Sequence, residues 1–196
     1  SSVGTGVKLL NTQKLYSQGG LIATDNSLDL AIDGAGFFQV LMPDGRMGYT
    51  RNGTFSRNGE GTLTSSSGYV LQPQIQIPEG VQEINISSDG IVSVLLPGEA
   101  IPQEAGQLAL ANFINPRGLQ AVGETFVVET PASGAPLEGL PRSAGFGKLN
   151  QGFLEGSNVN VVQQLVEMIE TQRAYEVSSK SISGVDEMMR FLSNNL

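Results

Sequence analysis

The stretch of sequence that decides the fold is LDLAIDGAGFFQVLMPDGRMGYTR, which covers residues 28–51. At its start, residues 28–33 alternate large apolar side chains with smaller or acidic ones, the pattern of a half-buried β-strand. Two more β-rich runs follow at 37–41 and 48–51, and an Asp-Gly pair at 44–45 lies between them. Because Asp and Gly both tolerate a positive φ, this pair predicts a tight hairpin and therefore an antiparallel sheet.

The same alternation of turn signals and short β-rich runs continues to about residue 156. Asn-Gly or Asp-Gly pairs at 52–53, 58–59 and 89–90 each precede an apolar run, as expected for further hairpins. Additional strands are predicted at four places: 69–71, 108–110, 126–129 and 148–155. The segment 130–147 is rich in Pro, Ser, Gly and Ala, and we interpret it as a long connection. This part of the chain is therefore predicted to be mainly β.

The tail has a different composition, because residues 158–195 contain no Pro and a single Gly. An apolar residue recurs at every seventh position: Val161, Met168, Tyr175, Ile182, Met189 and Leu196. Four further apolar residues widen this stripe: Leu165, Ile169, Val185 and Leu192. A seven-residue repeat sustained this long is typical of a helix that lies along another helix. The sequence therefore predicts a long C-terminal helix, roughly 55 Å at the usual helical rise, with this stripe as its candidate self-assembly site.

The predicted stripe needs a partner, and residues 1–156 contain no second long helical pattern. We expect the partner to be either a segment upstream of residue 1 or another copy of the chain. A helix folded back over the β region is the alternative. The chain does not start with Met and Ser1–Gly6 reads as a linker, so a further upstream segment is expected.

These patterns predict a mainly β fold with a long C-terminal α-helix, in three regions. Residues 28–146 are expected to form a β-rich outer domain. Residues 1–27, together with 147–157, are expected to form a less regular linking region. Residues 158–196 are expected to form an assembly helix.

Composition excludes several classes of chemistry. The 196 residues include no His, no Cys and no Trp. A Ser-His-Asp triad, a Cys nucleophile, a disulfide and a His- or Cys-ligated zinc site are therefore excluded. The net charge is −8, and residues 60–140 contain nine acidic residues against the single base Arg117. This acidic region argues against nucleic acid as a partner, since phosphate binding needs clustered Lys and Arg.

Motifs for cofactors, metals or catalysis are weak. The Gly34-Ala35-Gly36 sequence lacks the third glycine of a dinucleotide fingerprint and precedes a strand, so we interpret it as a turn. The spacing from Asp25 onward fails as a calcium loop, because Leu30 stands where the loop needs its Gly. No run approaches the ~18–20 apolar residues of a membrane span. The sequence thus predicts no catalytic residue, no cofactor and no metal.

Two parts of the chain carry a resemblance to a known family. Residues 30–40 and 49–55 closely resemble the signature stretch of bacterial flagellar rod and hook proteins. Residues 156–160 and 167–176 look like the C-terminal assembly helix of that family, whose N-terminal helix is not included here. Within the family, three segments are most similar to members that form the distal part of the rod: Gly4–Val7, Ser17–Gly19 and Thr130–Pro136.

The resemblance implies a structural subunit rather than an enzyme. Members of this family leave the cell unfolded through the flagellar export apparatus and stack helically into a hollow rod. That rod crosses the periplasm in the flagellar basal body and transmits torque to the hook. The expected partners are other copies of the chain, proximal rod and hook proteins, the ring bushing around the rod and the export apparatus. No nucleic acid and no small-molecule substrate are expected.

Two other functions remain open at this point. The nearer one is a hook protein, or another rod subunit, of the same family. The other is a periplasmic carbohydrate hydrolase that uses paired carboxylates, such as Asp29 with Asp33 or Glu99 with Glu104.

Overall fold

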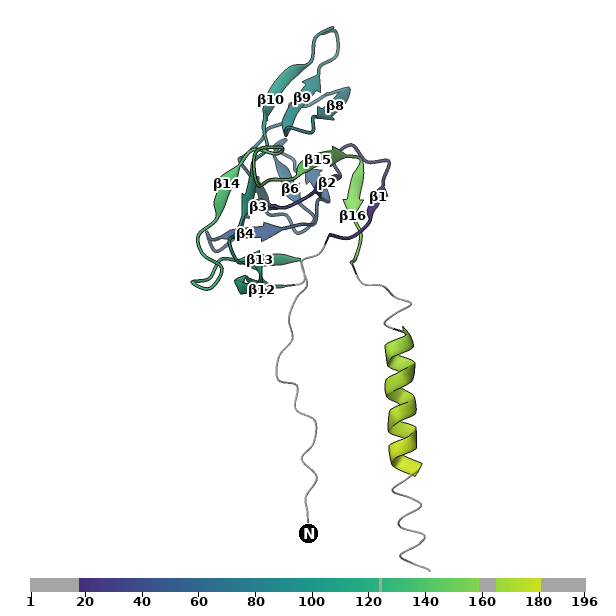
Figure 1. The fold of residues 1–196 in the computed structure, drawn as a ribbon. Coiled ribbons are helices and arrows are strands. Elements are labelled where there is room, and N and C mark those ends of the chain that lie inside the picture. The colour runs from purple at the N-terminus through teal and green to yellow at the C-terminus, as the bar shows by residue number, and fades with distance from the viewer. Residues whose placement is uncertain (1–17, 124, 159–164, 181–196) are drawn as a thin grey trace, which may run out of the picture. The chain divides into compact units, whose positions relative to one another are not determined.

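The structure is a computed structural model that describes residues 18–123, 125–158 and 165–180. The chain divides into two compact units, Ser1–Ser157 and Asn158–Leu196. The described part of the first unit, which we call the β body, consists of short strands and one turn of 3₁₀ helix (Figure 1). In the second unit, residues 165–180 are helical. The predicted fold class, mainly β with a C-terminal helix, is confirmed.

The largest sheet contains nine strands, and all its pairings are antiparallel. They are β3 (Phe37–Leu41), β4 (Met47–Thr50), β5 (Phe55–Arg57), β6 (Leu63–Ser65), β7 (Val70–Gln72), β11 (Leu110–Asn112), β12 (Gln120–Val122), β13 (Phe126–Val128) and β14 (Leu137–Gly139). β3 is at the centre of this sheet: β4 runs along one edge, while β11 and β7 share the other edge in succession. The predicted central hairpin is therefore the hub of the sheet.

Three smaller antiparallel sheets complete the β body. Their strands are β1 (Leu21–Ala23) with β16 (Phe153–Glu155), β2 (Leu30–Asp33) with β15 (Lys148–Gln151), and β8 (Glu83–Ile86) with β9 (Ile91–Leu95) and β10 (Gln103–Gln107). The 3₁₀ turn η1 (Pro116–Gly118) lies between β11 and β12. In Figure 1 the three-stranded sheet forms an extension at one end of the β body, opposite the β12–β13 hairpin.

Successive side chains of a strand point to opposite sides, and in β3 the side chains on both sides are buried. Phe38 belongs to the larger core, where its ring meets that of Phe55 edge to face at 5.0 Å. Phe37 belongs to a second core on the other face, where Phe113 meets both Phe37 and Tyr49 edge to face. The larger core also includes residues from β2, β6, β7, β9 and β15, so it joins three of the four sheets.

The turn signals predicted three hairpins correctly and one wrongly. Asp44-Gly45 joins β3 to β4 and Asp89-Gly90 joins β8 to β9, and both glycines have a positive φ. The pair at 58–59 also lies in a hairpin, between β5 and β6, although the residue with positive φ is Gly61. The pair at 52–53 joins β4 to β5, which do not pair with each other. Gly53 is needed there for close packing, since a Cβ would lie 1.6 Å from the Leu30 carbonyl oxygen.

Two segments differ from the prediction in more than their ends. The segment 130–147, predicted to be a connection, contains β14, which pairs with β11 in the large sheet. The predicted strand at 148–155 is two strands, β15 and β16, because Gly152 has a φ of 74° and breaks the extended run. β15 pairs with β2 and β16 pairs with β1, so the break sends the chain from one sheet to another.

The second unit is described from 165 to 180, and every residue of this stretch is exposed. Its Thr171 hydroxyl donates to the Glu167 carbonyl oxygen one turn earlier, at 2.8 Å. Among the residues that the structure describes, no helix is long and apolar enough to span a membrane.

Candidate functional site

The predicted self-assembly stripe is represented in the structure by four residues of the C-terminal helix. Leu165, Met168, Ile169 and Tyr175 are 50%, 55%, 49% and 76% exposed. With 3.6 residues per turn, these four side chains fall within about a third of the helix circumference. We call this set the apolar ridge. Gln172 and Glu176 interrupt this strip of large apolar side chains, and two further exposed apolar residues, Val166 and Val177, lie on another side of the helix.

The remaining predicted stripe residues lie outside the described residues: Val161, Ile182, Val185, Met189, Leu192 and Leu196. Their place in the stripe stays a prediction from the seven-residue repeat.

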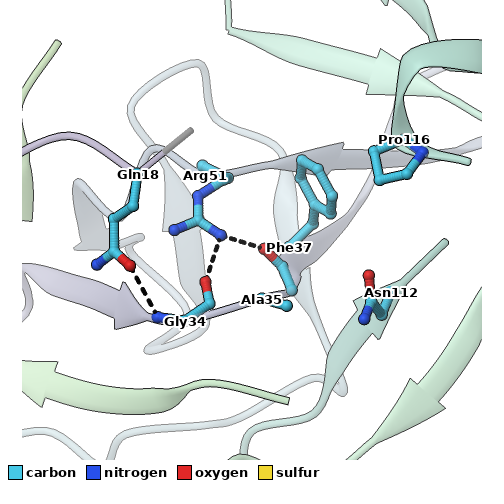
Figure 2. A pocket seen from close by; sticks show the side chains of 8 residues that line it. Gln18, Gly34, Ala35, Phe37, Arg51, Asn112 and Pro116 are labelled. Carbon is cyan, nitrogen blue, oxygen red and sulfur yellow. Dashed lines mark hydrogen bonds between the residues drawn. The ribbon is translucent and has the colours of Figure 1, made fainter. Parts of the chain in front are cut away.

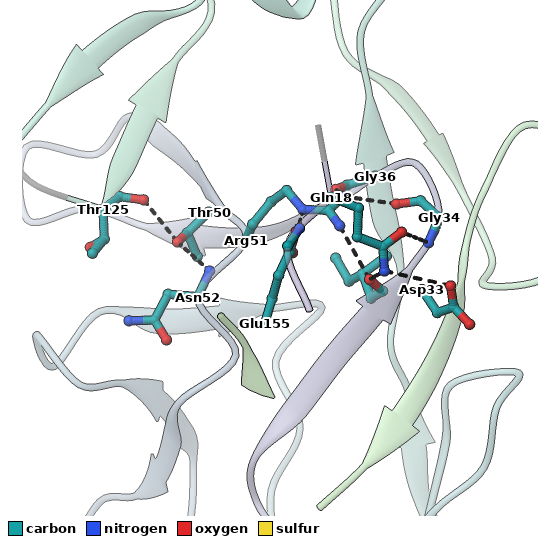
Figure 3. A network of polar contacts seen from close by, with 11 residues as sticks. Gln18, Asp33, Gly34, Gly36, Thr50, Arg51, Asn52, Thr125 and Glu155 are labelled. Carbon is teal, nitrogen blue, oxygen red and sulfur yellow. Dashed lines mark hydrogen bonds and ion pairs between the residues drawn. The ribbon is translucent and has the colours of Figure 1, made fainter. Parts of the chain in front are cut away.

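A polar network surrounds Arg51, which follows β4 directly, and connects segments from both ends of the β body (Figure 3). The Arg51 Nε atom donates to Glu155 Oε2 at 2.7 Å. Its Nη1 atom donates to the carbonyl oxygens of Gly34 and Gly36, each at 2.9 Å, and Nη2 donates to that of Ile32 at 3.1 Å. Four hydrogen bonds thus hold one guanidinium group: one goes to β2 and two go to the turn between β2 and β3.

Glu155 and Gln18 extend this network to the chain before β1. The second Glu155 oxygen, Oε1, accepts a hydrogen bond from the Gly19 amide at 3.0 Å. The Gln18 side chain accepts from the Gly34 amide at 3.1 Å and donates to the Ile32 carbonyl oxygen at 3.3 Å. Residues near both chain ends of the described β body are therefore connected to the same Gly34–Gly36 turn, Gln18 directly and Glu155 through Arg51.

A small pocket of about 240 Å³ lies beside this network (Figure 2). Gln18, Phe37, Arg51, Asn112 and Pro116 line it together with the Gly34–Gly36 turn. Its polar side chains already have partners, since Asn112 donates to the Gly145 carbonyl oxygen and accepts from the Phe113 amide. The groups that face the pocket are thus used to hold loops in place, and they offer no nucleophile or general base.

Three of the four carboxylates considered for a hydrolase have structural partners. Asp29 is buried and accepts a hydrogen bond from the Asn26 side chain at 2.9 Å. Asp33 pairs with Lys148 at 3.2 Å, across the β2–β15 ladder. Glu99 accepts from the Gln103 side chain at 2.7 Å. Within the described ranges, no group of three or more acidic residues is placed to hold a metal ion.

Sequence reasoning predicted the apolar stripe, whose role in assembly stays a prediction, and it missed the Arg51 network. Arg51 stands inside the motif at 49–55, yet nothing local to that motif indicates a role for it. Its partner Glu155 is 104 residues away, and only the fold brings the two together. The Gly34–Gly36 turn that Arg51 contacts is also distant in the sequence, so it gave no local signal.

Comparison with known protein families and proteins places the chain. Residues 31–94 match the family model described as "Flagellar hook protein FlgE/F/G D1 domain". Residues 150–196 match the model described as "Flagellar basal body rod FlgEFG protein C-terminal". The two models together cover the central hairpin, the β8–β9 hairpin and the helical unit.

Individual relatives point the same way. The chain is 51% identical to the flagellar basal-body rod protein FlgG of Buchnera aphidicola subsp. Schizaphis graminum, over 97% of this chain and 74% of the relative. It is 44% identical to FlgG of Caulobacter vibrioides, over 97% of this chain and 73% of that protein. The flagellar hook protein FlgE of Salmonella typhimurium is 38% identical, over only 60% of this chain and 29% of its own length. The similarity is thus greater and more complete to rod proteins than to this hook protein, and the chain belongs to the family of flagellar basal-body rod proteins.

Proposed function

We propose that this chain is a structural subunit of the distal flagellar rod and that its copies assemble through the apolar ridge. The observation that carries the proposal is the combination of rod-protein similarity along nearly the whole chain with a ridge of exposed apolar side chains. The subunit acts in the basal body, where it contacts other copies of itself and neighbouring rod and hook subunits.

The ridge suits this role for a physical reason. Fully burying a large apolar side chain stabilises a complex by about 1.5–3 kcal/mol. Leu165, Met168, Ile169 and Tyr175 are each about half exposed or more, so an interface that covers them gains several such contributions. A seven-residue repeat lets two helices interlock their side chains along a seam, and such packing resists sliding along the axis. A rod that transmits torque needs that resistance at every subunit contact.

Further partners follow from the family and are part of the proposal. The subunit passes through the flagellar export apparatus as an unfolded chain, and the absence of Cys suits passage between redox environments. The β body faces outward, towards the ring bushing. The function is mechanical, not enzymatic, and it requires no cofactor, nucleic acid or small-molecule substrate.

A matched pair of helix variants tests the proposal. Leu165→Asp puts a charge into the ridge, whereas Ala174→Asp puts the same charge on the opposite face of the helix. Burying an unpaired carboxylate is costly, so Leu165→Asp should abolish polymerisation of the full-length protein while the β body stays folded. Ala174→Asp should polymerise like the unmodified protein.

Electron microscopy under polymerising conditions measures filament yield, and circular dichroism checks that both variants are folded. Filaments from Leu165→Asp in unchanged yield, or equal loss with both variants, would contradict assembly through the ridge.

A further inference from the structure

We infer that the Arg51–Glu155 ion pair is a positioning clamp that fixes the chain where it leaves the β body after β16. The inference rests on the proposed function, because a subunit that carries torque needs the end of its β body to be firmly held. It goes beyond that function by naming the residues that hold this end.

The position of Glu155 is the first reason. It is the last residue of β16, three residues before the second unit begins at Asn158. β16 is hydrogen-bonded to one strand, β1, through a ladder of three residue pairs, and it also contacts β2. A two-stranded ladder of this size is marginally stable in water by itself. Contacts with the rest of the β body are therefore needed to hold its end, and those with β2 are one part of them.

The Arg51–Glu155 pair supplies that attachment. The Arg51 and Glu155 side chains are 21% and 11% exposed, so the pair is largely shielded from solvent. Charge-assisted hydrogen bonds in such surroundings are shorter and stronger than neutral ones. Arg51 is itself held by three carbonyl oxygens, one in β2 and two in the turn after it, so Glu155 is bound to a group that is fixed in place.

The clamp also holds the incoming segment. Glu155 Oε1 accepts from the Gly19 amide, and the Gly156 amide donates to the Gly20 carbonyl oxygen at 2.8 Å. The two backbones touch here, since a Cβ on Gly19 would lie 1.9 Å from the Gly156 carbonyl oxygen. One carboxylate therefore fixes the chain just before β1 and just after β16 at the same place.

The chain offers a matched control for this pair. Arg142 and Asp89 also form an arginine–carboxylate contact, at 3.1 Å, but their side chains are 58% and 51% exposed. That pair joins a loop to the Asp89-Gly90 turn. It does not lie where the chain enters or leaves the β body. Asp89→Asn and Glu155→Gln each neutralise one paired carboxylate without changing its size.

Amide hydrogen exchange tests the clamp on the unassembled chain. Glu155→Gln leaves one acceptor oxygen for two donors, the Gly19 amide and Arg51 Nε. Losing a charge-assisted hydrogen bond should raise exchange at Gly19 and Gly156 about tenfold or more. The amide of Val40, in the β3 core, should exchange as before. Asp89→Asn should leave all three amides unchanged. Equal acceleration at Val40 would show a merely global role and overturn the inference.

Distance measurements give a second readout that global destabilisation does not change below the melting temperature. Because the chain contains no Cys, spin labels can be placed at Ser67→Cys, in an exposed turn, and at Ser157→Cys, without background. The distance distribution should broaden with Glu155→Gln, and also with Arg51→Lys, which keeps the charge but loses the forked geometry. An unchanged distribution in both variants would overturn the inference.

Neither readout depends on polymerisation. A broadened distance distribution in Glu155→Gln, together with a protein that does not polymerise through the ridge, would support the clamp and contradict the proposed assembly mode. An unchanged distance distribution in Glu155→Gln, together with normal filaments, would contradict the clamp and support the assembly mode.

Discussion

The β body and the C-terminal helix treat their apolar residues in opposite ways. Leu30, Ile32 and Phe38 in the β body are fully buried, whereas Leu165 and Ile169 on the helix are 50% and 49% exposed. The β body satisfies its apolar side chains by packing strands of the same unit against one another. The helix instead leaves the apolar side chains of its ridge exposed. In the proposed function, the β body gives the subunit its stability and the ridge serves association with other copies.

The largest expected effect is the loss of a central core ring. Phe38→Ala removes a fully buried side chain that packs edge to face against Phe55, so it should lower the free energy of unfolding of the β body by about 3–5 kcal/mol. The same kind of truncation on the helix, Leu165→Ala, should change that free energy by less than about 0.5 kcal/mol. Urea unfolding followed by circular dichroism at strand wavelengths measures both. A similar loss of unfolding free energy in both variants would contradict the difference between the buried core and the exposed ridge.

The next effect compares two glycines that look alike in the sequence. Gly53 and Gly59 each follow Asn, but a Cβ on Gly53 would meet the Leu30 carbonyl oxygen, and a Cβ on Gly59 would meet nothing within 4 Å. Gly53→Ala forces the backbone apart and should cost about 2–3 kcal/mol, within the range for overpacking a core. Gly59→Ala should be neutral or slightly stabilising, because Ala reduces the freedom of the unfolded chain. Equal melting temperatures for the two variants would show that the β body tolerates looser packing than the structure indicates.

These two glycines also show what the sequence could and could not predict. Local signals were sufficient where one residue type decides the geometry, as in the hairpins at Asp44-Gly45 and Asp89-Gly90. They failed at Gly53, where the reason for glycine is a carbonyl group 23 positions earlier in the chain. They also failed at β14, whose three residues become a strand only because β11 offers a free edge. Contacts between distant segments leave no periodic trace in a single sequence.

The ridge and the clamp, whose roles are proposals, differ in the same way. The apolar stripe that contains the ridge was predictable, since a helix encodes its face in a repeat that can be counted. The Arg51–Glu155 clamp was not, because neither residue is unusual among its sequence neighbours. The pair forms only because the fold places β16 beside the Gly34–Gly36 turn.

The raised pKa of Tyr49 predicts an effect of intermediate size, a loss of β-body stability at high pH. Burial, with smaller contributions from the nearby charges of Glu129 and Glu138, raises the pKa of Tyr49 from 10.0 to about 12. The folded state therefore keeps the Tyr49 proton more tightly than the unfolded state. Its contribution to stability is complete below pH 10 and is lost as the pH rises to about 12, at about 1.4 kcal/mol per pH unit.

Unfolding free energies measured from pH 9 to 12 check this expectation. The unmodified protein should lose more stability over this range than Tyr49→Phe, which lacks the ionisable group. Tyr175→Phe, on the helix, should leave the pH dependence of the β body unchanged. Because the chain has no Trp, tyrosinate absorbance can be followed without interference. Parallel pH profiles for the unmodified protein and Tyr49→Phe would disprove the role assigned to Tyr49.

The smallest effect separates packing from surface charge within the β body itself. Lys148 and Asp33 form an ion pair at 3.2 Å across the β2–β15 ladder, but their side chains are 51% and 40% exposed. Exposed pairs of this kind contribute little, because water and salt screen them. Lys148→Gln should therefore lower the free energy of unfolding by about 0.5 kcal/mol or less, and the difference from the unmodified protein should vanish at about 1 M salt. A loss above about 1 kcal/mol that persists in salt would mean that surface charge, and not only buried apolar contact, holds β15 to the body. The buried apolar core would then be an incomplete explanation of how β15 is held in the β body.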